Sequence, residues 1–182
     1  MKKYLFLLFL ALTIILSSCS AEKIDPLSYQ EYPFTVEGTL ETEEINYDFT
    51  LHMTDAASSE ISFTKPDSLK SYIFRVTPKG TTLSYGDMTI DFNGGEKTNL
   101  IKLIPALFSL KKDDLVSSEE TILNSTTIDL HTYKTDLGQI KVYQNRENGN
   151  PLRFEGEDFT LNVQAFTPST LPTPTPTPAP QQ

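Results

Sequence analysis

The sequence predicts a mostly β (α+β) protein: a curved antiparallel half-barrel of about eleven strands, with a short helical insertion after the sixth strand. Apolar and polar residues alternate with period two along most of residues 34–166, which is typical of half-buried strands. The connections in the first half are two to four residues long, too short for parallel crossovers, so a doubly wound nucleotide-binding fold is excluded. One segment, 100–108, instead carries apolar residues at helical spacing.

Six strands are predicted before Asn93. Several of their connections contain Pro, Gly, Asp or Ser, which favour turns, so we expect a meander of antiparallel neighbours. In the two-residue link Gly86-Asp87, Gly86 can take the positive φ of a type II′ turn. The predicted strands cover residues 34–41, 46–53, 60–64, 71–77, 83–85 and 88–92.

A helix is predicted after the Asn93-Gly94-Gly95 turn, because Leu100 to Phe108 form an apolar stripe. Pro105 lies inside it and removes one backbone hydrogen bond, so we expect a kink or two short helices, the second beginning at Pro105. Strand patterns then resume at 121–123, 126–133, 139–143, 152–156 and 159–166.

The concave face of such a sheet must be filled by side chains, by a helix or by a ligand. Two interpretations stay open. The aromatic residues form an ordinary core closed by the helical segment, or an apolar cavity remains that admits a lipid. For the second interpretation, the candidate lining residues are Val36, Leu40, Phe49, Leu51, Phe63, Phe74, Leu83, Tyr85, Ile90, Leu103 and Leu107.

The N-terminus has the layout of a secretory signal. Lys2 and Lys3 precede an uncharged apolar run, 4–16, which is shorter than the roughly 20 residues of a membrane-spanning helix. The following Leu-Ser-Ser-Cys resembles a bacterial lipobox, which implies cleavage between Ser18 and Cys19 and a diacylglyceryl group on the Cys19 thiol. Cys19 is also the only cysteine, so no disulfide forms within the chain.

These features predict the organisation of the chain. We expect a lipoprotein signal peptide (1–18), a lipidated linker (19–33), the half-barrel domain (34–166) and a Pro/Thr-rich tail (167–182). Two acyl chains give durable anchoring, so the predicted location is the extracytoplasmic face of the cell membrane, or the outer membrane if the source has two membranes. The uncharged tail is expected to be an extended solvated spacer or disordered end, with a wall-penetrating or glycosylated segment as the alternative.

Few residues indicate catalysis. The formal net charge of −9 disfavours nucleic acid as a partner. His52 and His131 are far apart in the sequence and predicted at polar-facing surface positions, and no zinc motif or Gly-x-Ser-x-Gly elbow occurs. We therefore predict no catalytic residue, no metal site and no cofactor. The acidic pairs are interpreted as turn residues whose side chains diverge: Glu43-Glu44, Asp113-Asp114, Glu119-Glu120 and Glu157-Asp158.

Several segments together resemble the LolA and LppX half-barrel family of lipoprotein carriers, over roughly residues 32–166. They are Phe-Thr-Lys-Pro-Asp-Ser-Leu at 63–69, Tyr-Ile-Phe at 72–74, Leu-Ser-Tyr-Gly at 83–86 before the helical insertion, and Pro-Leu-Arg-Phe at 151–154. The resemblance implies an eleven-stranded curved sheet with helices against its concave face. The family's carriers usually begin with an amphipathic helix that plugs the barrel, whereas 20–33, interrupted by Pro26 and Pro33, looks too short for one.

The resemblance therefore implies an anchored, LppX-like binding module more than a diffusing carrier, and it assigns no individual binding residue. We expect a membrane-anchored extracytoplasmic lipoprotein, not an enzyme, that binds a lipid or other apolar ligand and serves lipid or lipoprotein trafficking. The alternative is a non-enzymatic cell-envelope scaffold that binds another envelope protein through its acidic surface.

Overall fold

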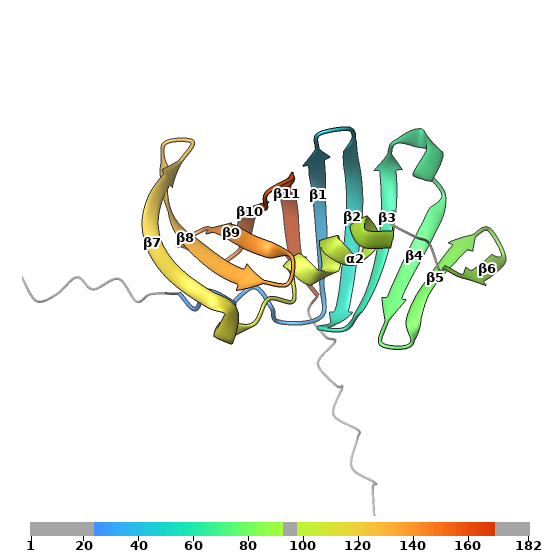
Figure 1. The fold of residues 1–182 in the computed structure, drawn as a ribbon, viewed down its shortest axis with the longest axis horizontal. Helices are drawn as coiled ribbons and strands as arrows, with labels where there is room; N and C mark the ends of the chain where they lie inside the picture. The colour runs from blue at the N-terminus through green and yellow to red at the C-terminus, as the bar shows by residue number, and fades with distance from the viewer. Residues whose placement is uncertain (1–23, 93–97, 170–182) are drawn as a thin grey trace, which may run out of the picture.

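The computed structural model describes residues 24–92 and 98–169, and in them eleven strands form one open antiparallel sheet (Figure 1). The predicted mostly β half-barrel is confirmed. The strands are β1 (Phe34–Thr42), β2 (Asn46–Asp55), β3 (Ser58–Lys65), β4 (Tyr72–Thr77), β5 (Gly80–Tyr85), β6 (Met88–Asp91), β7 (Leu115–Leu123), β8 (Thr126–Thr135), β9 (Gly138–Gln144), β10 (Pro151–Glu155) and β11 (Phe159–Pro168). Helix α2 (Thr98–Leu107) and two short 3₁₀ turns, η1 (Asp67–Leu69) and η2 (Lys112–Asp114), complete it.

The first and last strands pair at the centre of the sheet. The order is β6-β5-β4-β3-β2-β1-β11-β10-β9-β8-β7, so two meanders are joined between β1 and β11. Their register runs from Phe34 opposite Pro168 to Thr42 opposite Phe159. This pairing brings the β1–β2 connection next to the β10–β11 connection, and it leaves β6 and β7 as the two edges.

The predicted hairpin at Gly86-Asp87 is confirmed. Tyr85 pairs with Met88, so the two residues between them form the whole turn. Gly86 has a φ of +56°, a conformation that glycine adopts without steric cost.

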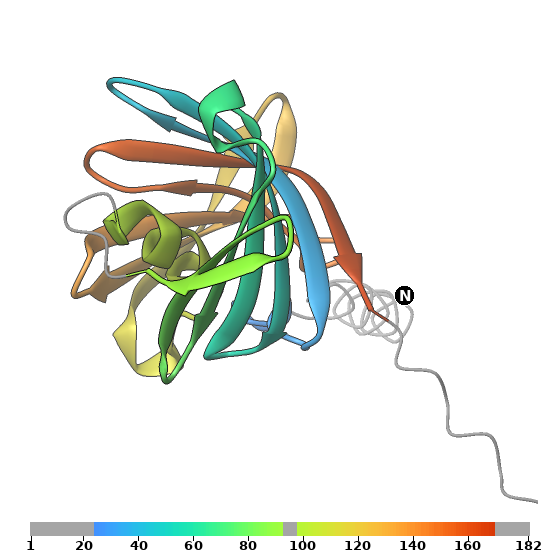
Figure 2. The ribbon, with the colours of Figure 1, turned by 90° about the vertical axis from the view of Figure 1, so that its right-hand side faces the viewer.

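The sheet curls around α2, which lies against its concave face (Figure 2). The helix is continuous, so the predicted second helix beginning at Pro105 is wrong. Pro105 stands in the last turn of α2. There the backbone hydrogen bonds join residues three apart in the sequence, from Phe108 N to Pro105 O (3.0 Å) and from Ser109 N to Ala106 O (3.1 Å). The hydrogen bond lost at Pro105 is outweighed by burial of Ile101, Ile104 and Leu107.

Strand β7 begins at Leu115, six residues before its predicted start at 121. As an edge strand it buries none of its nine residues fully and exposes six of them, and a bulge between Leu115 and Ser117 shifts its pairing with β8. Apolar and polar residues alternate along a strand only when one of its faces is buried. Strand β7 is largely exposed on both faces, so its mostly polar sequence showed no strand pattern.

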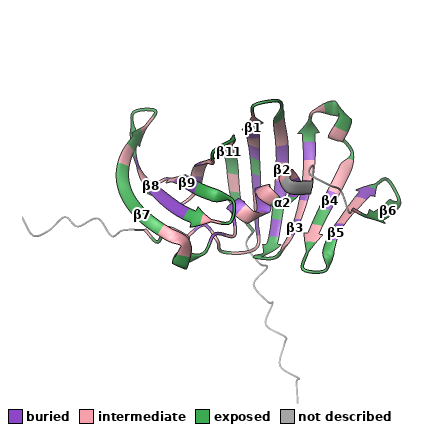
Figure 3. Cartoon of the chain, in the orientation of Figure 1, coloured by how far each residue is buried: buried purple, intermediate pink, exposed green. Residues whose placement is uncertain are grey.

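The core fills the concave side of the sheet, as the buried bands along its strands show (Figure 3). Phe108, directly after α2, stands among aromatic rings from three other parts of the chain: its ring centroid lies 6.4 Å from Tyr29, 6.0 Å from Phe34 and 4.8 Å from Phe154. The aromatic core with a covering helix, one of the two interpretations, is therefore present.

The described part of the predicted linker packs with the domain. Tyr29 is only 3% exposed and belongs to the core. Gln30 Nε2 donates to the carbonyl of Leu110 (3.0 Å), and the hydroxyl of Tyr32 donates to the carbonyl of Phe108 (3.0 Å). Short as it is, this segment covers part of the concave face. Ser18, Cys19 and residues 170–182 of the predicted tail lie outside the described residues.

Candidate functional site

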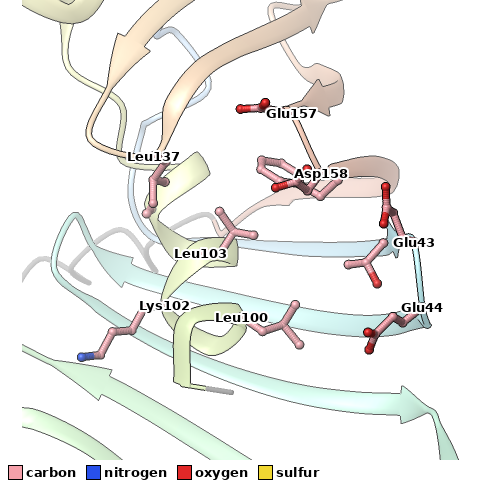
Figure 4. Close-up of a pocket in the computed structure, with 11 residues that line it drawn as sticks. Glu43, Glu44, Leu100, Lys102, Leu103, Leu137, Glu157 and Asp158 are labelled. Atoms are coloured by element: carbon pink, nitrogen blue, oxygen red, sulfur yellow. The ribbon is translucent and has the colours of Figure 1, made fainter. Parts of the chain in front are cut away.

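A groove of about 760 Å³ opens on the concave side, where α2 faces the connections between strands (Figure 4). This volume is within the range of ordinary small-molecule sites, about 300 to 1,000 Å³. The lining residues come from the end of β1 and the β1–β2 connection, from α2, from the β8–β9 turn, and from the β10–β11 connection and the start of β11. They are Thr42, Glu43, Glu44, Leu100, Lys102, Leu103, Ala106, Leu137, Glu157, Asp158 and Phe159.

The groove has an apolar floor. Leu100, Leu103 and Ala106 follow one another at three-residue intervals and so share one face of α2. Ile101 and Ile104, each one residue further along, are buried in the core instead. Leu137 of the β8–β9 turn and Phe159 at the start of β11 add apolar surface opposite α2. Helix α2 thus buries Ile101 and Ile104 in the core, while Leu100 and Leu103 both pack against the core and line the groove.

Of the eleven predicted lining residues, Leu103 lines this groove. Val36, Leu40, Phe49, Leu51, Phe63, Phe74 and Leu107 are at most 4% exposed within the core. Leu83 is partly buried beside the core, whereas Tyr85 (50% exposed) and Ile90 (58% exposed) lie at the β5–β6 edge. Ligand contact by these ten residues stays a prediction. Enlarging Val36 or Leu51 would disturb packing, so variants that test ligand binding belong at the groove.

From the sequence, the acidic pairs at 43–44 and 157–158 were predicted only as turn residues. The local interpretation holds, since both pairs lie between strands. Only the pairing of Thr42 with Phe159, distant in the sequence, brings the two turns together above α2. The signal that could have found the site was the combination of acidic turns with the predicted helix over a central β1–β11 pair.

His131 is 3% exposed, so its predicted surface position is wrong. Its Nδ1 lies 2.8 Å from Ser118 Oγ and its Nε2 2.8 Å from Gln144 Oε1. Three consecutive residues, His131, Thr132 and Tyr133, are all buried, because β8 is covered on both sides at this point. Alternation alone therefore could not place this side chain.

Gln144 joins His131 to the N-terminal segment. Its Nε2 lies 2.7 Å from the carbonyl oxygen of Gly149, 3.1 Å from Ser28 Oγ and 3.2 Å from the carbonyl oxygen of Asp25. The backbone N–H of Leu27 donates to the Asp25 carboxylate (2.9 Å), and this hydrogen bond lowers the pKa of Asp25. The segment entering the fold is thereby tied to β9.

Replacing Gln144 with alanine is expected to lower the free energy of unfolding by about 2 to 3 kcal/mol, because buried polar partners lose their hydrogen bonds. Amide exchange at Ser28 and Gln30 should accelerate more than exchange in β1. Chemical denaturation and hydrogen exchange measure the two effects, with the exposed variant Glu147→Gln as control. Unchanged exchange at Ser28 would contradict this role.

Tyr133 is fully buried, and its hydroxyl has no hydrogen-bond partner among the residues in the described ranges. Burial raises the pKa of Tyr133 above its ordinary value. Tyr133→Phe should therefore stabilise the fold by about 1 kcal/mol at neutral pH.

The same variant should weaken the alkaline pH dependence of stability. A phenol whose pKa is higher in the folded state contributes stability fully below its unfolded pKa of about 10, and loses it as the pH rises through the folded pKa. Tyr143, with a pKa raised to about 12 mainly by burial, keeps part of the dependence in the variant. Melting temperatures between about pH 7 and pH 11 test this; parallel curves for both proteins would contradict it.

Two kinds of feature are absent from the described residues. None of their helices is long and apolar enough to cross a membrane. Within residues 24–92 and 98–169, no group of three or more His, Cys, Asp or Glu side chains is arranged to hold a metal ion.

No protein-family model matches the sequence, and a search of curated proteins gives no match. Solved structures do match. An uncharacterized conserved protein from Thermus thermophilus is 17% identical, with a TM-score of 0.54 over 81% of this chain and 87% of that one. MucB is 11% identical, with a TM-score of 0.50 over 82% of this chain and 58% of MucB.

A LolA superfamily protein from Nitrosomonas europaea is 10% identical, with a TM-score of 0.45 over 81% of this chain and 93% of that one. At these identities the likeness is one of fold. The sheet of the chain is the open eleven-stranded half-barrel that the sequence predicted.

Proposed function

We propose that this protein is a membrane-anchored extracytoplasmic lipoprotein that binds a lipid or other apolar ligand in the groove beside α2, without transforming it. The observation that carries the proposal is the groove itself, about 760 Å³ with leucines and a phenylalanine in its lining, next to a core already closed by its own side chains. The ligand would therefore lie above α2 and not inside the barrel.

The position of the groove relative to the ends of the described chain supports a role in transfer. Ser169 N donates to the carbonyl of Pro33 at the start of β1, whereas Thr42 at its other end lines the groove. The first and last residues of β1, Phe34 and Thr42, are eight residues apart, which spans about 26 Å of strand. The β1–β2, β8–β9 and β10–β11 connections lie on the side opposite the ends of the described chain (Figure 2). A chain anchored at Cys19 would hold its groove away from the membrane, where a partner can deliver or collect a ligand.

A neutral probe tests the binding proposal without a contribution from ligand charge. The chain from Ser20 to Gln182, which keeps every described residue, is titrated with a fluorescent monoacylglycerol below its critical micelle concentration. Saturable binding of about one probe per chain is expected. A signal that rises linearly, or no signal, would overturn the proposal.

The anchor makes a separate prediction. Replacing Cys19 with alanine in a bacterial host should abolish incorporation of labelled palmitate and leave the signal peptide uncleaved, because both steps of the proposed processing act at this residue. Gel mobility and autoradiography of the whole chain measure the outcome. Equal labelling of the variant would show that Cys19 is not the acceptor.

Binding of another envelope protein is the second candidate function, favoured by strand β7. This edge strand has no second neighbour among the described strands and exposes Val116 and Ile122. Free edges and apolar side chains suit addition of a partner's strand. A photo-crosslinker at Val116 in the producing cell should yield one discrete protein adduct if this function holds; only free chain would count against it.

A further inference from the structure

We propose that the ligand of the groove is a cationic amphiphile, with an amine head group beside a single apolar chain. This inference rests on the proposed binding function and adds the charge of the ligand. It is argued from the distribution of charge around the groove.

Four carboxylates stand at the rim. Glu43 and Glu44 belong to the β1–β2 connection, and Glu157 and Asp158 to the β10–β11 connection, which the pairing of Thr42 with Phe159 makes neighbours. Figure 4 shows these side chains along one side of the groove, with Leu100 and Leu103 of α2 directed toward them. The negative charge therefore borders the apolar floor.

None of these four carboxylates forms an ion pair with another described residue. Acids elsewhere on the sheet do: Asp48 pairs with Lys65 at 2.7 Å and Glu60 with Arg75 at 2.8 Å, while Glu120 contacts Arg146. Lys102 also lines the groove, but Figure 4 shows its side chain directed away from the four acids. Among the described residues, the rim thus carries a negative field that no ion pair neutralises, and a neighbouring low-dielectric surface strengthens it.

This arrangement matches one ligand chemistry. An acyl or alkyl chain would lie against Leu100, Leu103 and Phe159, and an ammonium at its end would meet the carboxylates. A fatty acid of the same length would bring a carboxylate to the same place. One exposed pair of opposite charges typically changes affinity by about 1.5- to 5-fold, so several carboxylates acting together should give about tenfold discrimination.

The test compares three ligands of one chain length on the chain from Ser20 to Gln182: dodecylammonium, monododecanoylglycerol and dodecanoate. Calorimetry at low ionic strength should show dodecylammonium binding about tenfold more tightly than dodecanoate, with the neutral ligand between them. Salt at about 0.5 M should remove most of the difference, because screening acts on exposed charges.

Amide variants locate the effect. The rim variant carries Glu43→Gln, Glu44→Gln, Glu157→Gln and Asp158→Asn and should bind all three ligands within about twofold of one another. The matched control makes the same change in net charge at exposed acids outside the groove and should keep the tenfold preference; it carries Glu31→Gln, Glu37→Gln, Asp87→Asn and Glu147→Gln.

The outcomes separate this inference from the function on which it rests. If monododecanoylglycerol binds but dodecanoate binds as tightly as dodecylammonium, the cationic preference is wrong and the apolar site stands. A preference lost equally in the control variant would also overturn it. If none of the three ligands binds, the proposed function itself fails.

Discussion

Replacing Phe108 with alanine should lower the free energy of unfolding by about 3 to 5 kcal/mol, the usual cost of removing a buried phenylalanine. Phe108 is fully buried, and its ring contacts Tyr29, Phe34 and Phe154. The cavity would open where α2, the N-terminal segment and the central strands meet, so no single neighbour can move in to fill it.

Urea denaturation of the chain from Ser20 to Gln182 measures this loss. The matched control is Ile122→Ala, since Ile122 is 73% exposed on the edge strand and should change stability by less than about 0.5 kcal/mol. A loss below about 1 kcal/mol for Phe108→Ala would mean that the aromatic cluster does not hold α2 and the N-terminal segment against the concave face of the sheet.

Ala106→Trp should weaken binding of the neutral acyl probe at least tenfold, about 1.4 kcal/mol, while leaving the fold intact. Ala106 is half-buried and lines the groove one turn of α2 after Leu103. An indole there would occupy the volume that the apolar chain needs.

Ile122→Trp is the control for this variant, because it adds the same side chain at an exposed site outside the groove. The melting temperature of Ala106→Trp should stay within a few degrees of the parent. Unchanged probe affinity in a folded Ala106→Trp variant would place the ligand elsewhere.

Strands with one buried face were predictable because their alternation reports burial directly. Along β1, Val36 and Leu40 are buried and Glu37 and Glu41 are exposed, which is the pattern that the sequence displays. Strand β7 was mostly missed because both of its faces are largely exposed, so its polar run resembles a loop. Burial of His131 was missed because its hydrogen bonds to Ser118 and Gln144 come from neighbouring strands.

The groove was predictable only in part. Helical spacing identified Leu103, but most of the residues predicted to line a cavity are buried in the core, such as Leu51 and Phe63. The strand pattern shows which side chains point inward and not how completely they fill the concave face. How completely the concave face is filled depends also on Phe108 and Tyr29, which come from segments outside the sheet.

Native mass spectrometry tests the central claim most directly, that the groove beside α2 holds an apolar ligand. The chain from Ser20 to Gln182 and its Ala106→Trp variant would be purified from a bacterial host and measured without added ligand. The account predicts an acyl- or alkyl-containing adduct of about one molecule per chain on the parent, largely lost from the variant. A bare parent mass, together with no uptake of the neutral probe, would contradict it.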